Sequence, residues 1–214
     1  MLLPITCPMR AVLKFCLLNK IITRRYFLIK FIALLFNFFI LFLLESCQTI
    51  PKSIISKPRL NSNQLTAFFM SMKPDADEEK IKRISSTYII ESKIESINSD
   101  IAFAQMCLET GYLSFTGIVK SDMNNFCGLG AIDTVNNGVV FETEELGIRA
   151  HIQHLKAYAS KKPLINDCVD PRYKFVMPKG KSPYLKGLTG KWATDPEYSK
   201  KLESILIRMY KFLL

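Results

Sequence analysis

The sequence predicts an α+β domain that is mainly helical, carries one inserted β-hairpin and is preceded by an apolar N-terminal segment. Three observations support this prediction. Apolar residues recur at helical spacing in several stretches from residue 65 onward. An Asn-Asn-Gly turn at residues 136–138 is flanked by β-branched residues, a pattern typical of a hairpin. Residues 31–44 form an apolar run that only Asn37 interrupts.

The N-terminal residues 1–47 are predicted to be a signal peptide or a membrane anchor. Basic residues from Arg24 to Lys30 precede the apolar run, which is short for a bilayer span. The run leads into the letters LLESC, ending at Cys47, which resemble the lipobox of bacterial lipoproteins. That resemblance implies lipidation of Cys47 and a membrane-tethered protein of the cell envelope. Glu45 departs from the stricter form of the box, so an uncleaved anchor remains the alternative.

The charge of the chain does not favour a nucleic-acid partner. The net charge is +10, but six of the 29 Lys and Arg residues and one of the 19 acidic residues precede residue 48. The remaining net charge of +5 suits an anionic polymer or surface. Basic residues interleaved with aromatic ones, the usual sign of nucleic-acid binding, do not occur in the sequence.

The cysteines give no sign of a metal site. Only Cys107, Cys127 and Cys168 follow the N-terminal segment, and their spacing matches no zinc signature. One disulfide and three free thiols are both compatible with this number. We expect neither a metal nor a cofactor.

The segment that follows, residues 48–63, is rich in serine and proline and is predicted to be a linker. Residues 64–214 then form the folded domain. Helices are predicted before Pro74, and in the stretches 75–96, 100–110, 143–160 and 195–214. Asn98 and Thr143 are the predicted N-caps of two of them, Gly111 ends the third, and 161–190 is mostly loop.

Three motifs occur in order within this domain: AFAQMCLETGYLSF, NNFCGLGA with the downstream LGIRAHIQHLKAY, and GKWATDPEYSKKL. Together they resemble the glucosaminidase domain of glycoside hydrolase family 73, over about residues 65–206. This resemblance implies a lysozyme-like fold and cleavage of the β-1,4 bond after N-acetylglucosamine in peptidoglycan glycan strands.

The resemblance also implies roles for single residues. It makes Glu109 the general acid and Tyr198 a supporting catalytic residue. A second carboxylate occurs on the hairpin of some family members, and here Asp133 is the better candidate and Glu142 the alternative. The residues implied to shape the substrate cleft beside the acid are Asn124, Asn125, Phe126 and Gly128.

The setting of Glu109 agrees with an acid role. A glutamate at a helix C-terminus faces the negative end of the helix dipole, and apolar neighbours desolvate it; both effects raise its pKa. A general acid needs a raised pKa to stay protonated near neutral pH. Without the three motifs, a solvated glutamate would be the simpler interpretation of the same residue.

Trp192 and the two histidines are less specific. Trp192, the single tryptophan, could stack on a sugar face or pack in the core or at the cleft rim. His151 and His154 lie three residues apart on a predicted helix, and no third ligand accompanies them. We therefore expect both histidines to be exposed helix residues.

Two other functions fit the same sequence. A lytic transglycosylase also uses one glutamate on a lysozyme-like fold, but leaves an anhydro product. A non-catalytic wall-binding lipoprotein would keep the cleft without turnover, and the loose match of the second carboxylate leaves this interpretation open.

Overall fold

The computed structural model of the chain describes residues 29–36, 50–131 and 137–212. The chain divides into two units, residues 1–49 and 50–214. In the first unit, residues 29–36 are helical. Among the described residues no helix is both long and apolar enough to cross a bilayer. Cys47 lies outside the described residues, so the signal or anchor segment and its lipidation remain predictions.

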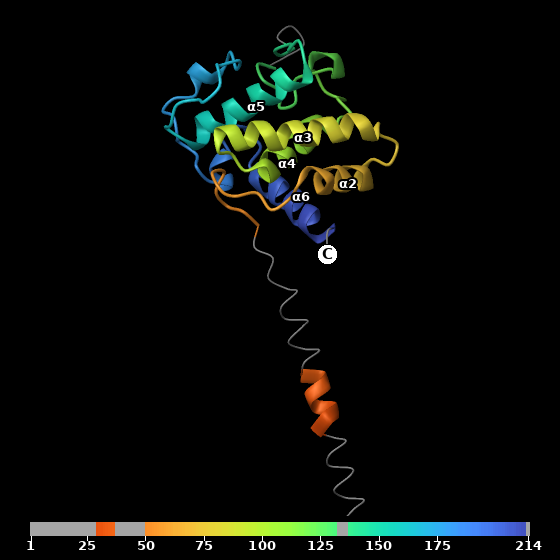
Figure 1. Cartoon of the computed structure of the whole chain (residues 1–214). Helices are drawn as coiled ribbons and strands as arrows, with labels where there is room; N and C mark the ends of the chain where they lie inside the picture. The colour runs from red at the N-terminus through yellow and green to blue at the C-terminus, as the bar shows by residue number, and fades with distance from the viewer. Residues whose placement is uncertain (1–28, 37–49, 132–136, 213–214) are drawn as a thin grey trace, which may run out of the picture. The chain divides into compact units, whose positions relative to one another are not determined.

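The second unit is mainly helical, as predicted. Figure 1 shows α3 across the front of this unit, with α4 partly behind it, α5 above and α2 and α6 below. Short 3-10 turns lie in the loops. The elements are α2 (Ser62–Met72), α3 (Glu78–Glu95), α4 (Ser99–Thr110), η1 (Ser121–Met123), α5 (Glu144–Ala159), η2 (Tyr173–Phe175), η3 (Leu185–Leu188) and α6 (Tyr198–Phe212).

Helix α4 is the central element, because it contacts α3, α5 and α6 and buries all but two of its residues. The side chain of Asn98 caps its N-terminus by accepting from the backbone N–H groups of Asp100 and Ile101. Gly111 ends it at a φ of +57°, a conformation that glycine adopts without steric cost. Both predicted ends of this helix are confirmed.

The chain turns sharply after α4. Tyr112, Leu113 and Phe115 all have positive φ angles, between +46° and +57°, which side chains other than glycine seldom adopt. Their side chains pack against the core: the ring of Tyr112 lies 5.8 Å from that of Phe69, and the ring of Phe115 lies 6.5 Å from that of Phe126. This packing offsets the backbone cost of the turn.

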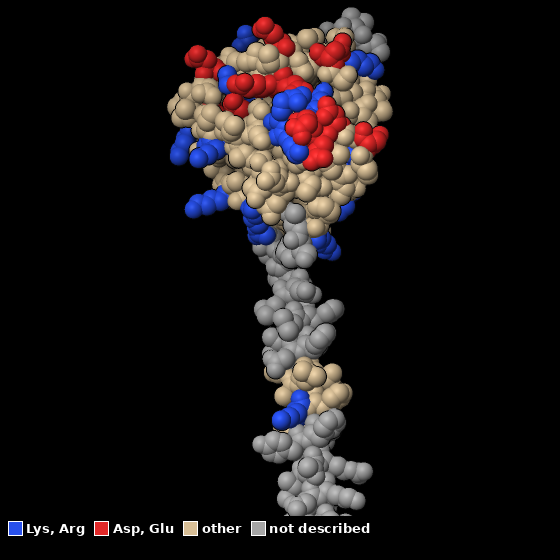
Figure 2. Space-filling view, turned by 45° about the vertical axis from the view of Figure 1, so that its right-hand side comes forward, with Lys and Arg blue, Asp and Glu red and all other residues tan. Residues whose placement is uncertain are grey.

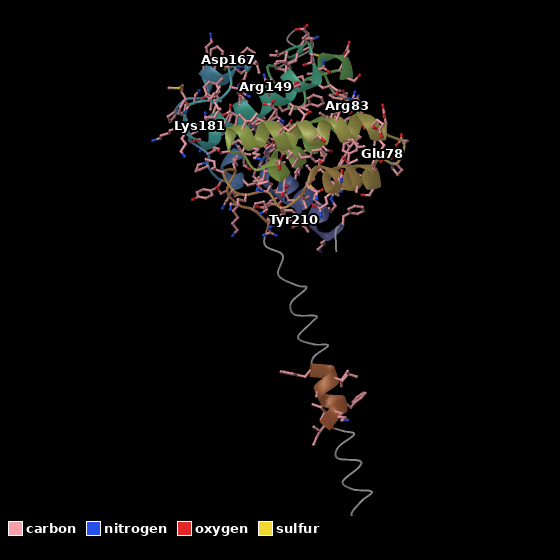
Figure 3. The ribbon with its side chains drawn as sticks, viewed as in Figure 1. Glu78, Arg83, Arg149, Asp167, Lys181 and Tyr210 are labelled. Atoms are coloured by element: carbon pink, nitrogen blue, oxygen red, sulfur yellow. The ribbon has the colours of Figure 1, made fainter. Side chains whose placement is uncertain are left out.

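Residues 50–61 correct the prediction of a linker, because they pack on the domain. Ile54 is fully buried, its N–H donates to the carbonyl of Pro183, and its carbonyl accepts from Asn98 N–H. The carboxylate of Asp100 accepts from the N–H of Arg59 (2.8 Å) and from the hydroxyl of Tyr210 (2.7 Å). Polar composition predicted a free tether, but a few buried contacts at the start of α4 hold the segment in place. Figure 3 labels Tyr210 at the lower edge of the domain.

Two buried or half-buried ion pairs connect α5 to α3. Arg149 binds Glu91 through two parallel bonds of 2.9 and 3.1 Å, the geometry that suits a guanidinium and a carboxylate. Figure 3 labels Arg149 at α5, above α3. Lys156 pairs with Glu95 at 2.6 Å, and Glu95 also accepts from backbone N–H groups of the loop after α5. These bonds fix the position of α5 relative to α3.

The predicted hairpin is not confirmed by the described residues. Among the described residues, Ala131 and Asn137 form an isolated antiparallel bridge, and the N–H of Val139 donates to the carbonyl of Leu129. The described residues include isolated bridges but no longer strand. Asp133, which precedes the predicted turn at 136–138, lies in residues 132–136, outside the described residues.

Charges of both signs alternate on the face shown in Figure 2. On α3, Lys82 pairs with Glu78 and Glu79, while Lys80 pairs with Glu144 of α5 at 3.4 Å. Alternating charges give no broad field of one sign there, unlike the basic surface that binds a polyanion.

Gly147 provides a test of how closely α5 approaches the segment before the hairpin. A Cβ at this position would lie 1.7 Å from the carbonyl oxygen of Asn124. We expect Gly147→Ala to lower the melting temperature by at least about 5 °C, because a clash with backbone cannot be relieved by a rotamer change. Thermal unfolding followed by circular dichroism measures the change.

Gly117→Ala is the matched control, since no atom lies within 4 Å of its Cβ position and its φ is not positive. Equal melting temperatures for the two variants would contradict the close approach of α5 to Asn124.

Candidate active site

Three residues from distant parts of the chain meet at one oxygen atom. Glu109 lies in the last turn of α4, and its Oε1 accepts a 3.0 Å hydrogen bond from Nε1 of Trp192. The same oxygen accepts a short hydrogen bond from the hydroxyl of Tyr198. Trp192 comes from the loop after η3, and Tyr198 is the first residue of α6. The structure thus brings the two catalytic residues predicted within the described part of the chain into direct contact.

The start of α6 is held close to this point by local bonds. The carboxylate of Asp195 accepts from the N–H of Glu197 at 2.9 Å, and its carbonyl accepts from the N–H of Tyr198. The hydroxyl of Thr189 bonds with Ser199, so the loop that carries Trp192 is attached to the same turn. Trp192 and Tyr198 are therefore positioned together.

The surroundings of Glu109 raise the pKa of its carboxyl. Burial of the carboxyl among the neighbouring side chains is the main cause, and the bonds from Tyr198 and Trp192 oppose it by stabilising the charged form. The residue as a whole is open to solvent on the side of the pocket, while protein surrounds its other sides. The predicted direction of the shift is confirmed, with desolvation as its largest cause.

An open pocket of about 470 Å³ lies beside Glu109. Its walls come from the end of α4, the turn after it, and the segment that leads into the hairpin. Asn125 and Gly128 line this pocket, in agreement with their predicted place in the cleft. Among the described lining residues Glu109 is the one carboxylate.

Asn124 and Phe126 support the pocket wall instead of forming its surface. The amide of Asn124 donates to the carbonyl of Phe141, and the side chain of Phe126 is buried. Asn125 connects two segments beside the pocket. Its amide donates to the carbonyls of Leu129 and Val139, and its Oδ1 accepts from the N–H of Leu129. Contact of any of these residues with a substrate remains a prediction.

Trp192 packs at the rim of the site. Its ring lies 5.1 Å from that of His154, 5.4 Å from that of Tyr158 and 5.8 Å from that of His151. The residue is half-buried, and its indole N–H is engaged by Glu109. Of the two interpretations offered by the sequence, the structure favours rim packing.

The expectation of two exposed histidines is wrong. His151 is fully buried, and burial lowers its pKa to about 3. His154 is mostly buried and bonds through Nδ1 to the carboxylate of Asp170 at 2.7 Å. The cause is tertiary, because this face of α5 is covered by α4 and by the loop that holds Asp170. No group of three or more metal-ligating side chains occurs in the described ranges.

Of the two candidates for the second carboxylate, only Glu142 lies in the described part of the chain. Glu142 is exposed and does not line the pocket, while Asp133 lies outside the described residues. Cys107, Cys127 and Cys168 are free thiols, of which the first two are buried.

Gln105 is a residue of the site that the sequence did not predict. Its amide donates to the hydroxyl of Tyr198 at 2.8 Å. The available signal was an amide in an otherwise apolar stretch of helix.

Two comparisons with known proteins bear on this site. The family model described as mannosyl-glycoprotein endo-beta-N-acetylglucosaminidase matches residues 85–211, from α3 to α6. An uncharacterized protein of Borreliella burgdorferi is 42% identical over 159 residues, which are 74% of this chain and 78% of that protein. The family match includes Glu109, Trp192 and Tyr198.

The raised pKa of Glu109 predicts a stability effect that depends on pH. The folded state favours the neutral carboxyl, so this contribution is present below the unfolded pKa and is lost as the pH rises through the folded pKa. The side chain of glutamine is neutral at every pH, so it does not carry this cost. We therefore expect Glu109→Gln to raise the melting temperature at pH 7 by about 2 °C, and to give no gain at about pH 3.

Scanning calorimetry at several pH values measures this difference. Glu142→Gln, the same change at an exposed carboxylate, serves as the control. A variant less stable than the parent at neutral pH would contradict the desolvation of Glu109.

Proposed function

The chain belongs to the mannosyl-glycoprotein endo-beta-N-acetylglucosaminidase family, and on this premise we propose that it hydrolyses the β-1,4 bond after N-acetylglucosamine in peptidoglycan. The family supports glycoside hydrolysis in general. The observation that carries the finer proposal is the carboxyl of Glu109, whose pKa is raised and which faces an open pocket.

In this proposal Glu109 is the general acid that protonates the leaving glycosidic oxygen. Burial raises the pKa of this carboxyl, so at a given pH more of it is protonated than in a fully solvated glutamate, which is the direction a general acid requires. Both hydrogen bonds reach Oε1, and no described residue bonds to Oε2. We assign the transferred proton to Oε2 for this reason.

Tyr198 and Trp192 then stabilise the carboxylate that the proton transfer leaves on Glu109. Once the proton has left, Glu109 carries a negative charge, and the two donors already point at its Oε1. Donors fixed in advance stabilise a charge that develops during the reaction at no cost of reorganisation. Their bonds therefore strengthen on the way to the transition state.

As the glycosidic bond breaks, the sugar carbon becomes positively charged and needs a group that stabilises it or delivers water to it. Asp133 is the proposed carboxylate for this role, from its predicted position on the hairpin. A separation of about 5–5.5 Å from Glu109 would make it a nucleophile, and about 6.5–9.5 Å a base for water. Without such a carboxylate the acetamide of the substrate would take this part.

Lytic transglycosylase activity is the second candidate. It is favoured by the single carboxylate among the described lining residues of the pocket. The two activities differ in their products, because hydrolysis leaves a reducing N-acetylglucosamine end and transglycosylation leaves an anhydro-muramic end.

The N-terminal segment supports a location in the cell envelope. We propose that lipidation of Cys47 or an uncleaved apolar segment tethers the protein to a membrane on the side where peptidoglycan lies. Metabolic labelling with a fatty acid would distinguish the two, since Cys47→Ala abolishes labelling only in the first case.

The main test uses the full chain in detergent on isolated peptidoglycan, with released fragments reduced and identified by mass spectrometry. We expect reducing N-acetylglucosamine ends from the parent, and a rate about 10³-fold lower from Glu109→Gln, the loss typical of a missing general acid. Tyr198→Phe should lose about tenfold, because one of two donors to Oε1 remains.

Anhydro-muramic ends would replace this proposal by the transglycosylase. If the parent bound peptidoglycan and released no fragments, the enzyme proposal would be wrong and wall binding would be left.

Asp133→Asn tests the second carboxylate on the same substrate. We expect a loss of about 10²-fold, because an amide cannot act as nucleophile or base. Asp122→Asn, at an exposed position in η1, controls for the change of charge. Equal rates for both variants would instead favour the substrate's own acetamide.

A further inference from the structure

A line of hydrogen bonds runs from Glu109 into the core of the domain. The hydroxyl of Tyr198, which donates to Glu109, accepts from Nε2 of Gln105 at 2.8 Å. Oε1 of Gln105 lies 3.1 Å from Nε2 of His151, and Nδ1 of His151 lies 2.9 Å from the hydroxyl of Tyr88. The five residues come from α3, α4, α5 and α6, so the line connects these helices.

The donors in this line all point toward Glu109. Since Gln105 donates through Nε2, its Oε1 must accept, and Nε2 of His151 must therefore carry a proton. Burial lowers the pKa of His151 to about 3, so the ring is neutral and its Nδ1 carries no proton. The hydroxyl of Tyr88 then donates to Nδ1.

Because these polar groups are buried, each of them needs a hydrogen-bond partner inside the protein. Tyr88, Gln105 and His151 are fully buried, and Tyr198 is 4% exposed. A buried polar group is costly without a partner, and apolar side chains of similar shape would fill the same space at less risk. Each group here has its partner, and the line ends at the carboxyl of the site. Such an arrangement fits a role in the site better than a role in stability alone.

We propose that Gln105 and His151 are positioning residues, which hold the hydroxyl of Tyr198 so that its proton points at Oε1 of Glu109. The N–H of Gln105 occupies one side of the phenolic oxygen, so the hydroxyl proton must point to the other side, where Glu109 lies. His151 in turn fixes which way the amide of Gln105 faces.

This geometry makes Tyr198 a stronger donor. A hydroxyl that accepts one hydrogen bond donates the next one better, by about 10–30% per bond in a chain. The bond to Glu109 should therefore weaken when Gln105 loses its amide, and the carboxylate form of Glu109 should become less favourable. The kinetic consequence rests on the proposed function, but the positioning itself does not.

Other titratable groups lie near Glu109 and must be considered. Burial raises the pKa values of Tyr198 and Cys127 well above their usual range, so both are neutral where Glu109 titrates. Behind Trp192 lie His154 and Asp170, which pair with each other. The titration of Glu109 must therefore be followed by a signal from its own carboxyl carbon, so that it is not confused with the titration of these groups.

The first experiment needs no activity. The full chain in detergent, labelled with ¹³C at glutamate carboxyls and ¹⁵N at histidine rings, is titrated by NMR, and Glu109→Gln and His151→Phe assign the signals. We expect His151 as the neutral ring with its proton on Nε2. In Gln105→Leu the midpoint of Glu109 should rise by about 0.3 pH unit.

Gln153→Leu is the matched control. It removes the same amide from an equally buried position, where Gln153 bonds to the backbone of residues 167, 169 and 170. Its expected effect is on melting temperature, with the midpoint of Glu109 unchanged.

The second experiment measures rates on soluble peptidoglycan fragments. We expect Gln105→Leu to lower kcat about threefold, less than the loss in Tyr198→Phe, with KM within about twofold, because a misplaced donor affects the transition state more than binding. His151→Gln, whose amide can still donate to Gln105, should retain more activity than His151→Phe.

The outcomes separate the two proposals. A proton on Nδ1 of His151 in the parent, or an unchanged Glu109 midpoint in a folded Gln105→Leu, overturns the positioning whatever the activity. The tautomer is measured on the parent and so decides even if Gln105→Leu does not fold. A parent with the expected NMR signals and no fragment release would overturn the hydrolase and leave the positioning in place.

Discussion

The meeting of Tyr198 and Trp192 at one oxygen of Glu109 is the contact on which the site depends. A carboxyl that is partly removed from water needs donors, and the hydroxyl of Thr110 in the same turn already donates to the carbonyl of Met106. Both donors come from the C-terminal quarter of the chain, so α6 and the loop before it must lie beside the end of α4. The helical packing supplies this placement.

A second tyrosine fixes the other end of the same helix pair. Tyr210, near the end of α6, donates to Asp100 in the first turn of α4, while Tyr198 at the start of α6 donates to Glu109. The two helices are therefore antiparallel, and at each end a tyrosine hydroxyl of α6 donates to a carboxyl group of α4. A slip of one turn would break both bonds, so the pair has one register.

Much of this structure could be predicted from local sequence. Capping residues such as Asn98 and Gly111, and the apolar spacing between them, define helices through contacts within a few residues. Glu109 and Tyr198 lie in contact, in agreement with the common site that their motifs imply, while their catalytic roles stay predictions. The burial of His151 and of Ile54 was not predicted, since it depends on segments that lie far away in the sequence. The place of Gln105 beside the site could not be predicted for the same reason, because its two partners come from α5 and α6.

The turn after α4 affects how the pocket responds to a ligand. Tyr112, Leu113 and Phe115 hold positive φ angles at a cost of about 1–3 kcal/mol each, and two of their side chains are anchored among core aromatic rings. Relaxing any of these angles would pull a side chain out of its packing. Of the three, Phe115 lines the pocket, so this part of its wall is held in place by packing inside the domain before anything binds. A sugar chain entering there would meet a surface whose conformational entropy has already been lost during folding, so little further ordering would oppose binding.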